Sequence, residues 1–476
     1  MSRHDAVDPI AWILPSSLHR PAILYTIRLL STLLGRSAVI TTPDKSHTSG
    51  HPHVHYSDQP ASADDDFNIP CDIEFWKTAE QGIFVTPRQT AEWNGATVPV
   101  WNLALAYDVP DVVAAAFFHV SRLEELARTE RDRHGRYQAS NSWLIRAGLI
   151  ERPVVHDYAH AIATALGLQK RPGSMWPDDQ PFAVALTHDI DRLRMHGEWQ
   201  HELRHLSGQL LRGSGLGLIG RQLASRRRTE RGQQTDPYET IDLLARQHQE
   251  HGFSATFYWI AAEPSALDSD YVVSHDDTAK LIRSLQDDGF ETALHGSYNS
   301  YLSTDMLAAE REILSRVVHT SVKSTRQHYL RFAAARTWRA QCDAGLKTDS
   351  SLGFAERAGF RAGLAVPFQP WSFADNRPYD LWEVPLVLMD VTLKEYMHFD
   401  IDDAIEKSRK IIETLQAYGA GAAILWHNSS LNELDWRGWD RVYDDWLGNI
   451  RRLDGWGTSV GQMVDAWQRH TESLGN

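Results

Sequence analysis

Cysteine is almost absent from this chain of 476 residues, which contains only Cys71 and Cys342. Two cysteines so far apart form neither the closely spaced pairs of a structural zinc site nor a redox motif. They provide no disulfide framework either, and such scarcity is typical of proteins from a reducing compartment. We therefore expect a cytoplasmic protein that is held together by its core rather than by covalent cross-links.

Long apolar runs are missing as well. Residues 1–18 mix charges and prolines with apolar residues, so we expect no secretory signal. The apolar stretch 22–34 carries Arg28 at its centre and is too short to span a bilayer. We expect an amphipathic helix of the core there, with a peripheral helix on a membrane surface as the alternative. An integral membrane segment is not expected.

The chain has no excess of positive charge. Its formal net charge of -14 argues against nucleic acid as a partner. The 17 tryptophans are compatible with a carbohydrate ligand, because aromatic rings suit the apolar faces of sugars, although burial in a core is the simpler explanation. A length of 476 residues exceeds what one core usually supports, so we expect two domains.

A stretch rich in proline, glycine and charge, residues 169–179, marks the expected domain boundary near residue 175. Before it we expect an α+β domain of residues 1–175, with helices at 114–127 and 155–166. Four histidines between positions 47 and 55 could bind a metal. They lie among Ser, Pro and Gly, however, and a loop is the simpler interpretation.

After the boundary, residues 176–476, apolar runs alternate with helix-like segments. The expected strands are 182–186, 255–260, 290–294, 324–326, 345–348, 360–362, 381–385 and 422–426. The expected helices are 239–251, 278–288, 304–318 and 404–418. This β-α-β-α order predicts an α/β fold with a parallel sheet, which is either open or rolled into a barrel.

Residues 196–234 interrupt that alternation with a basic insertion, which we expect to be partly helical and to cross the mouth of the sheet. Its arginines are Arg221, Arg226, Arg227, Arg228 and Arg231. A solvated face is the simplest role for them. Contact with a phosphate or an acidic glycan is the alternative.

Polar residues collect just after the apolar runs, where parallel sheets and barrels place their chemistry. The set is His188, Asp189, Asp191, His295, Arg326, His328, Asp349 and His427. Two carboxylates and an imidazole within four positions repel one another unless a cation or a shared proton relieves the repulsion. Asp and His with positions left open for water form the ligand set of a catalytic divalent metal such as zinc. A loop of solvated acids is the alternative.

Four segments resemble, in order, the successive motifs of the polysaccharide deacetylases, the NodB-homology group of carbohydrate esterase family 4. They are Thr187-His188-Asp189-Ile190-Asp191, His295-Gly296-Ser297-Tyr298-Asn299, Arg326-Gln327-His328-Tyr329 and Leu425-Trp426-His427. The resemblance covers roughly residues 180–440. It implies a distorted (β/α) barrel of seven strands, preceded here by the smaller N-terminal domain.

The resemblance also implies a metal-assisted hydrolysis of an N-acetyl or O-acetyl group. Asp189 looks like the general base, and Arg326 like the arginine that keeps that carboxylate ionised and oriented. His427 resembles the general acid that protonates the leaving amine or alcohol. The main-chain N–H near Tyr329 could donate to the oxyanion. We further expect Tyr298, Tyr329, Asp349 and Trp426 to contact the substrate.

The metal ligands depart from the family pattern in two places. Ile190 stands where the family has its aspartate ligand, and Asn299 stands where it has a second histidine. We expect Asp191 and His295 as ligands, with the third from His328 or Asn299. His328 is favoured by the preference of zinc for nitrogen and Asn299 by alignment, and His188 is a further candidate. Zinc is the expected ion, with other transition metals as alternatives.

Three hypotheses for function follow. The first is a deacetylase that acts on an acetamido sugar, glycan or glycolipid precursor in bacterial surface-polysaccharide metabolism. The second is an amide hydrolase of the same fold with a substrate that is not a sugar. The third is a carbohydrate-binding or scaffold protein that kept the barrel and lost turnover, which the altered ligands would permit.

Overall fold

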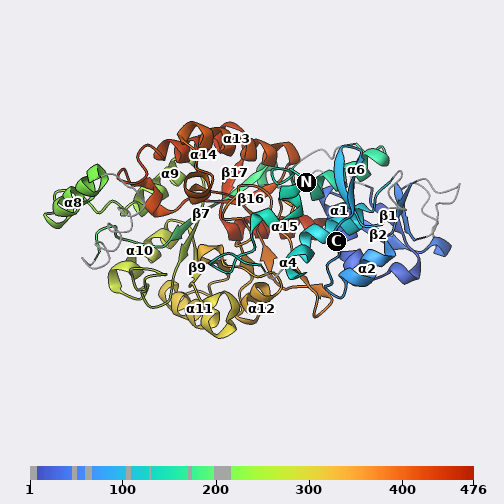
Figure 1. Ribbon diagram of the computed structural model, residues 1–476, viewed down its shortest axis with the longest axis horizontal. Helices are drawn as coiled ribbons and strands as arrows, with labels where there is room; N and C mark the ends of the chain where they lie inside the picture. The colour runs from blue at the N-terminus through green and yellow to red at the C-terminus, as the bar shows by residue number, and fades with distance from the viewer. Residues whose placement is uncertain are drawn as a thin grey trace.

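The computed structural model of the chain describes residues 8–45, 51–58, 67–102, 109–127, 130–169, 174–197 and 216–475. The molecule is elongated (Figure 1). A small N-terminal sheet lies at one end, a larger sheet with its helices fills the middle, and the helix α8 (Leu216–Glu230) forms the other end. Within the described ranges, every helix is too short or too polar to cross a lipid bilayer.

A four-stranded parallel sheet organises the N-terminal part. Its order is β2-β1-β3-β4, with β1 at Ile10–Ile13, β2 at Ala38–Thr41, β3 at His53–Ser57 and β4 at Asn68–Pro70. The helix α1 (Pro21–Leu33) connects β1 to β2, and its Ile23, Ile27 and Leu30 are fully buried. The prediction of a core helix here is therefore confirmed.

The remaining elements of this part pack around α1 and the sheet. They are α2 (Ile73–Ala79), the antiparallel hairpin β5 (Gln89–Trp93) and β6 (Ala96–Val100), α3 (Val112–Val120), α4 (Leu123–Ala127), α5 (Trp143–Arg146) and α6 (Val154–Ala165). The prediction of one helix over residues 114–127 is wrong in one respect. Arg122 has a φ of 55°, which ends α3 and begins α4 in a new direction.

The break at Arg122 places a buried group of charges between the N-terminal part and the barrel. Arg122 donates to Glu124 and Glu125 at 2.9 Å each. Glu125 also accepts two hydrogen bonds, at 2.9 and 2.7 Å, from Arg361, which lies 236 residues later in the chain. All four side chains are nearly inaccessible to water. This bidentate pair fixes the two parts of the molecule to each other.

The larger sheet is parallel along its whole strand order and has the β/α alternation that the sequence predicts. Its strands, in the order of the sheet, are β14 (Trp382–Glu383), β11 (Thr348–Asp349), β10 (Ser324–Gln327), β9 (Glu291–Gly296), β8 (Thr256–Trp259), β7 (Ala183–Ile190), β16 (Gly421–Leu425) and β15 (Leu386–Met389). A further strand, β17 (Trp456–Thr458), pairs with the beginning of β7.

The two ends of this strand order are neighbours in the chain. β14 pairs with β11 and β15 pairs with β16, and only Val384 and Pro385 separate β14 from β15. One segment therefore closes the sheet into a barrel, and counting it once leaves seven strands around the barrel among the described residues. Pro385 lies between the two strands, so its missing backbone N–H removes no hydrogen bond from the sheet. The fold class implied by the resemblance is confirmed.

Helices cover the outside of the barrel. α9 (Ile241–His251), α10 (Asp276–Asp287), α11 (Thr304–Val318) and α13 (Ile401–Tyr418) confirm the four predicted helices to within three residues at each end. The sequence analysis missed α12 (Arg336–Asp343), α14 (Asp440–Arg452) and α15 (Val460–Leu474). Figure 1 shows α13 and α14 on one side of the barrel and α11 and α12 on the opposite side.

The predicted strand at 360–362 does not form. Gly359 has a φ of 135°, and the main-chain N–H groups of Gly359 and Phe360 bond to Val387 and Ile150 rather than to a ladder. A side chain at Gly359 would lie 2.3 Å from the carbonyl oxygen of Ile150. This apolar segment is therefore buried by close packing against the N-terminal part, which hydrophobicity alone does not distinguish from burial in a sheet.

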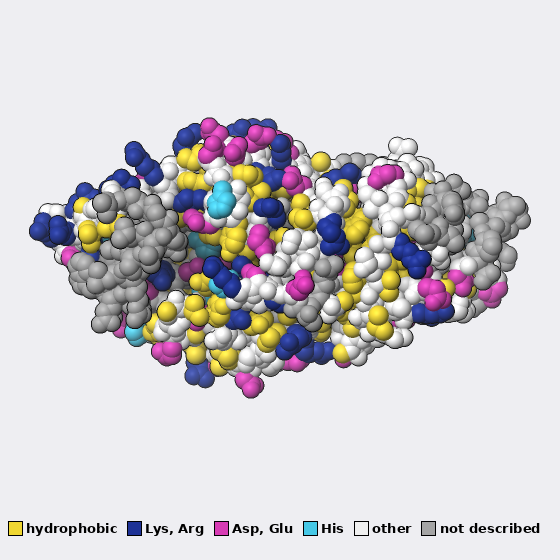
Figure 2. Space-filling view, viewed as in Figure 1, with side chains coloured by type: hydrophobic (Ala, Val, Ile, Leu, Met, Phe, Trp, Pro, Cys, Tyr) yellow, Lys and Arg dark blue, Asp and Glu magenta, His cyan; other side chains and the backbone are white. Residues whose placement is uncertain are grey.

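The basic insertion is helical in part, as expected, since α8 lies within it. Arg226 is buried and bonds Glu230 at 2.8 Å, whereas Arg221, Arg227 and Arg228 are exposed. Figure 2 shows the basic side chains gathered at the end of the molecule that α8 forms.

Candidate metal centre and active site

The carboxyl ends of three strands of the barrel bring the predicted residues together, with β8 lying between β7 and β9. β7 carries Asp189 and is followed at once by Asp191, β9 carries His295, and β10 carries Arg326 with His328 directly after it. In the register of β9 and β10, His295 lies opposite Arg326. Because side chains alternate along a strand, Asp189 and Asp191 face the same side of the sheet.

Asp191, His295 and His328 form a cluster that could hold a metal ion. One ligand atom from each of the three lies within 4.8 Å of the others. Asp191 Oδ1 lies 3.4 Å from Nε2 of His295 and 3.4 Å from Nε2 of His328. Among the described residues this is the one such group of His, Cys, Asp or Glu side chains.

Each histidine of the cluster is oriented by a bond at its other ring nitrogen. Nδ1 of His295 lies 3.0 Å from the carbonyl oxygen of Arg326, and Nδ1 of His328 lies 3.2 Å from Oδ1 of Asp268. Both partners are acceptors, so each Nδ1 donates its proton to its partner and each Nε2 is directed at Asp191. Metal-ligating histidines are held in this way in known sites.

The residues present fit a divalent ion such as zinc. Asp191 Oδ1 is buried yet has no hydrogen-bond partner, and a buried oxygen without a partner is costly unless something else binds it. Two imidazole nitrogens and one carboxylate oxygen form a set found in catalytic zinc sites, which leave a position open for water. The carboxylates of Asp191 and Asp268 make the cluster electrostatically negative. Burial alone would lower the pKa of His328, but these two carboxylates raise that pKa to about 9.

Asp189 lies behind the cluster and is paired with Arg326. The guanidinium donates to Asp189 Oδ1 at 2.9 Å, and it is itself fixed by Thr187 and Ser350. Both side chains are buried. Burial by itself would raise the pKa of Asp189, but the charges of His295 and Arg326 hold it below its usual value. Asp189 is therefore an ionised carboxylate whose Oδ2 faces His295 at 3.5 Å.

His427 approaches the cluster from the opposite direction, directly after β16. Its Nε2 lies 3.9 Å from Asp191 Oδ2. Asp390 accepts from the main-chain N–H of His427 and from Nδ1, both at 2.8 Å. Burial alone would lower the pKa of His427, but the Asp390 carboxylate raises it to about 10. The imidazole is thus charged, and only Nε2 is directed at the site.

Two of these residues escaped the sequence analysis. Asp390 directly follows the apolar strand β15, so the rule that located the other site residues would have found it had the strand been extended past Pro385. Asp268 lies in a loop after β8 that carries no periodic pattern. Only the tertiary structure brings its carboxylate to His328.

Three predicted residues, His188, Trp426 and Asp349, are placed differently from the expectation. His188 points to the other face of β7, where it contacts His248 at 2.7 Å, so it is not a ligand of the cluster. Trp426 is buried among Tyr443 and Trp446, and Asp349 is buried as well. Both side chains are almost inaccessible to solvent.

Asn299, the alternative third ligand, is exposed at the start of a short helical turn. Its amide oxygen accepts from Arg331 at 3.4 Å. The other alternative, His328, lies in the cluster itself. The geometry therefore favours His328 as the third ligand.

Tyr298 and Tyr329 lie beside the cluster. The ring of Tyr329 is 4.5 Å from that of His328 and remains 38% exposed, and Tyr298 meets Tyr329 edge-on at 5.4 Å. Tyr329 has a φ of 59° and Leu330 one of 53°. Such a backbone is strained for bulky residues, and strain of this kind is concentrated at functional sites.

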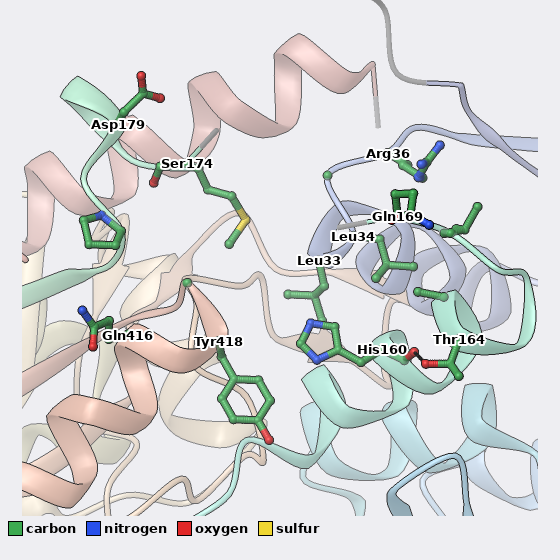
Figure 3. A pocket seen from close by; sticks show the side chains of 16 residues that line it. Leu33, Leu34, Arg36, His160, Thr164, Gln169, Ser174, Asp179, Gln416 and Tyr418 are labelled. Atoms are coloured by element: carbon green, nitrogen blue, oxygen red, sulfur yellow. Dashed lines mark hydrogen bonds between the residues drawn. The ribbon is translucent and has the colours of Figure 1, made fainter. Parts of the chain in front are cut away.

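A separate cavity of about 610 Å³ lies between the N-terminal part and the barrel, lined by residues of α1 and α6 and by the end of α13 (Figure 3). In it the ring of His160 stacks on Tyr418 at 5.6 Å. None of its lining residues belongs to the cluster around Asp191.

Comparison with known proteins gives the following. Residues 12–171 match a family of unknown function, DUF7033. No curated protein matches the sequence. Similar solved structures include a protein from Mycobacterium smegmatis described as a polysaccharide deacetylase, with 17% identity over 63% of this chain and 94% of that chain, at a TM-score of 0.41.

Two more are the Puue allantoinase and a second protein described as a polysaccharide deacetylase, from Pseudomonas aeruginosa PAO1. Each has 12% identity over 63% of this chain at a TM-score of 0.42. The match covers 94% of the allantoinase and 95% of the Pseudomonas protein.

Proposed function

We propose that this protein is a metal-dependent deacetylase that removes an acetyl group, foremost an N-acetyl group, from an amino sugar within a glycan or glycolipid precursor. One observation carries the proposal: an ionised carboxylate, a charged imidazole and a three-residue ligand cluster meet at one mouth of the barrel. Deacetylation needs a base for the attacking water, an acid for the leaving amine and an electrophile for the acetyl carbonyl. All three must be arranged around one carbonyl carbon.

Asp191, His295 and His328 would hold the ion. A divalent ion there would supply Lewis-acid activation of water and of the acetyl carbonyl. The two Nδ1 anchors, the carbonyl of Arg326 and the carboxylate of Asp268, fix the rings before any ion arrives.

Asp189 would take a proton from the attacking water. Arg326 keeps that carboxylate ionised and holds its Oδ1, so Oδ2 is the oxygen left for proton transfer. A base whose pKa lies below its usual value is weak by itself. A cation in the cluster would acidify the water on which this base acts.

His427 would give a proton to the leaving amine. Its Nδ1 is held by Asp390, so Nε2 is the atom that can deliver the proton. The Asp390 charge keeps the imidazole protonated at neutral pH. The main-chain N–H of Tyr329 is proposed to donate to the oxyanion.

The test is release of acetate from a panel of N-acetylated amino sugars by the purified, zinc-loaded protein. Asp189→Asn should abolish release while zinc content stays equal to that of the unmodified protein. Asp402→Asn, a change of the same kind on the exposed surface of α13, is the matched control. Acetate release that survives in Asp189→Asn, or that continues after the metal has been removed by a chelator, would contradict the proposal.

A further inference from the structure

A loop of the N-terminal domain, residues 130–137, reaches the candidate active site. It connects α4 to α5, whose Leu123, Trp143 and Leu144 share one hydrophobic core with β1. From there it runs onto the barrel beside β9 (Figure 1). His134, in the middle of this loop, stacks on the ring of Tyr329 at 4.9 Å with the planes 28° apart.

The 130–137 loop is rigid because Asp132 binds it internally. Its carboxylate accepts from the main-chain N–H groups of His134 and Arg136, at 2.8 and 2.9 Å, and from Nε of Arg136 at 2.7 Å. Gly135 completes the turn with a φ of 77°, where a side chain would meet the hydroxyl of Tyr301 at 3.3 Å. The position of His134 is therefore set before a substrate binds.

Two arginines fix this loop to the barrel. Arg136 donates to the carbonyl oxygen of Tyr329 and to the hydroxyl of Tyr396, both at 3.1 Å. Arg331 donates to the carbonyl oxygen of His134 at 2.8 Å and lies 3.9 Å from the centre of the Tyr298 ring. The contacts hold the strained turn at Tyr329 from both sides.

The hydrogen bonds of His134 determine what the Tyr298 hydroxyl can do. Nε2 of His134 accepts from Nε of Arg133 at 3.0 Å, because a guanidinium only donates. The proton of the neutral ring is then on Nδ1, which lies 3.1 Å from the Tyr298 hydroxyl oxygen. That oxygen therefore accepts from His134, and its own O–H is left to donate to a group in the site.

We propose that the N-terminal domain is part of the active site: through His134 it positions Tyr298 and Tyr329 as an aromatic shelf that binds the pyranose ring of the substrate. The inference rests on the proposed function and extends it to substrate recognition. The half-exposed ring of Tyr329 offers an apolar face to the sugar. The Tyr298 O–H donates to a ring hydroxyl, and His134 is a positioning residue that does not touch the sugar.

The experiment compares two substrates of the full-length, zinc-loaded protein. Di- and trisaccharides of N-acetylglucosamine need the shelf, and 4-nitrophenyl acetate, which has no sugar ring, does not. Tyr298→Phe should raise KM for the oligosaccharides about tenfold with little change in kcat, the size of one lost hydrogen bond. His134→Phe keeps a ring on Tyr329 and removes both hydrogen bonds, and it should raise the same KM.

Hydrolysis of the ester should stay within about twofold of the unmodified protein in both variants. The matched control is His160→Phe, the same change in the same domain but in the cavity away from the cluster, and it should leave both substrates unaffected. Thermal unfolding and zinc content identify a variant that fails to fold. If His134→Phe does not fold, Tyr298→Phe decides the outcome.

The outcomes separate the two proposals. If zinc-loaded protein hydrolyses the oligosaccharides and both variants leave KM unchanged, the shelf is overturned and the deacetylase proposal stands. If the ester is hydrolysed but no oligosaccharide is, the shelf as a sugar subsite is overturned. If neither substrate is hydrolysed, the proposed function is wrong and this inference falls with it.

Discussion

Arg136 and Arg331 each donate a hydrogen bond across the boundary between the N-terminal part and the barrel. Arg136 donates to the main chain of Tyr329 in the barrel, and Arg331 donates to the main chain of His134 in the N-terminal domain. Each guanidinium thus fixes the backbone of the opposite loop. Because Tyr329 directly follows the candidate ligand His328, these two hydrogen bonds join the N-terminal part to the candidate metal centre.

The third ligand can be decided by metal binding. We expect His328→Ala to bind zinc more than about a hundredfold more weakly, because even a lost orienting partner of a ligand costs about 10- to 100-fold. Asp268→Asn should fall within that smaller range, since it removes the carboxylate charge at Nδ1 of His328 and leaves all three candidate ligands in place. Competition titration with a chromophoric chelator measures both. Asn299→Ala is the control, and an equal loss of affinity in that variant would restore Asn299 as the ligand.

His427 as general acid predicts a dependence on the leaving group. His427→Gln should slow the release of acetate from an N-acetyl sugar by about 10²- to 10⁴-fold, because an amine must be protonated to leave. Hydrolysis of 4-nitrophenyl acetate should fall far less, since nitrophenolate leaves without a proton. Steady-state kinetics on both substrates give the comparison. An equal loss on both would assign His427 to another step.

The buried pair of Glu125 and Arg361 should dominate the stability of the domain boundary. Glu125→Gln leaves buried guanidinium charges without their partner, and it should lower the free energy of unfolding by about 3–5 kcal/mol. Asp445→Asn, which breaks the exposed pair with Arg409, should cost less than about 1 kcal/mol. Urea unfolding at pH 7 measures both. Equal effects of the two changes would refute a special role for Glu125.

The same pair predicts how stability depends on acid. Burial opposes the charge of Glu125, but Arg361 and Arg122 lower its pKa from 4.5 to about 2. A lowered pKa stabilises the folded state above the unfolded value, and this contribution is lost as pH falls from about 4.5 to 2. Unfolding curves across that range should therefore show a steeper loss in the unmodified protein than in Glu125→Gln. If the unmodified protein and Glu125→Gln lose stability in parallel as pH falls, the lowered pKa of Glu125 is contradicted.

Asp349 and Glu383 form a buried carboxyl pair. Its contribution to stability should change with pH in the opposite sense to that of Glu125. Burial raises the pKa of Asp349, and burial with the Asp349 charge raises that of Glu383 well above its usual value. Raised values stabilise the folded state at acidic pH, and that contribution is lost as pH rises. Asp349→Asn keeps the acceptor for Ser351 and removes one charge, so it should be more stable than the unmodified protein at pH 8.

The comparison of Asp349→Asn is made by thermal unfolding at pH 5 and pH 8. The difference between the variant and the unmodified protein should appear only at the higher pH. KM for the substrate should not change, because Asp349 is buried away from solvent. A raised KM would return Asp349 to the substrate site, where the sequence analysis expected it.

The sequence by itself determined most strands of the barrel and several residues at their carboxyl ends, but it missed β15. An apolar run that stops at an acid or a histidine predicts both a buried strand and polar residues at its end, and this holds for Asp189 and His295. The same reasoning wrongly predicted a strand at 360–362. An apolar segment can be buried by close packing against Ile150 as completely as it is buried within a sheet. The reasoning also stopped too early at Pro385 and so missed Asp390.

Only the tertiary structure decided how the candidate ligands are held and which loop of the N-terminal part lies beside them. Asp268 and His134 lie in loops, where no periodicity shows which distant side chain they will meet. Side-chain alternation on β7 turns His188 away from the cluster that Asp189 and Asp191 face, a distinction that depends on register in space rather than on position in the chain. The residue types indicated the candidate chemistry, whereas the partners that orient these side chains come from other segments, 31 to 60 residues away for the histidines of the site.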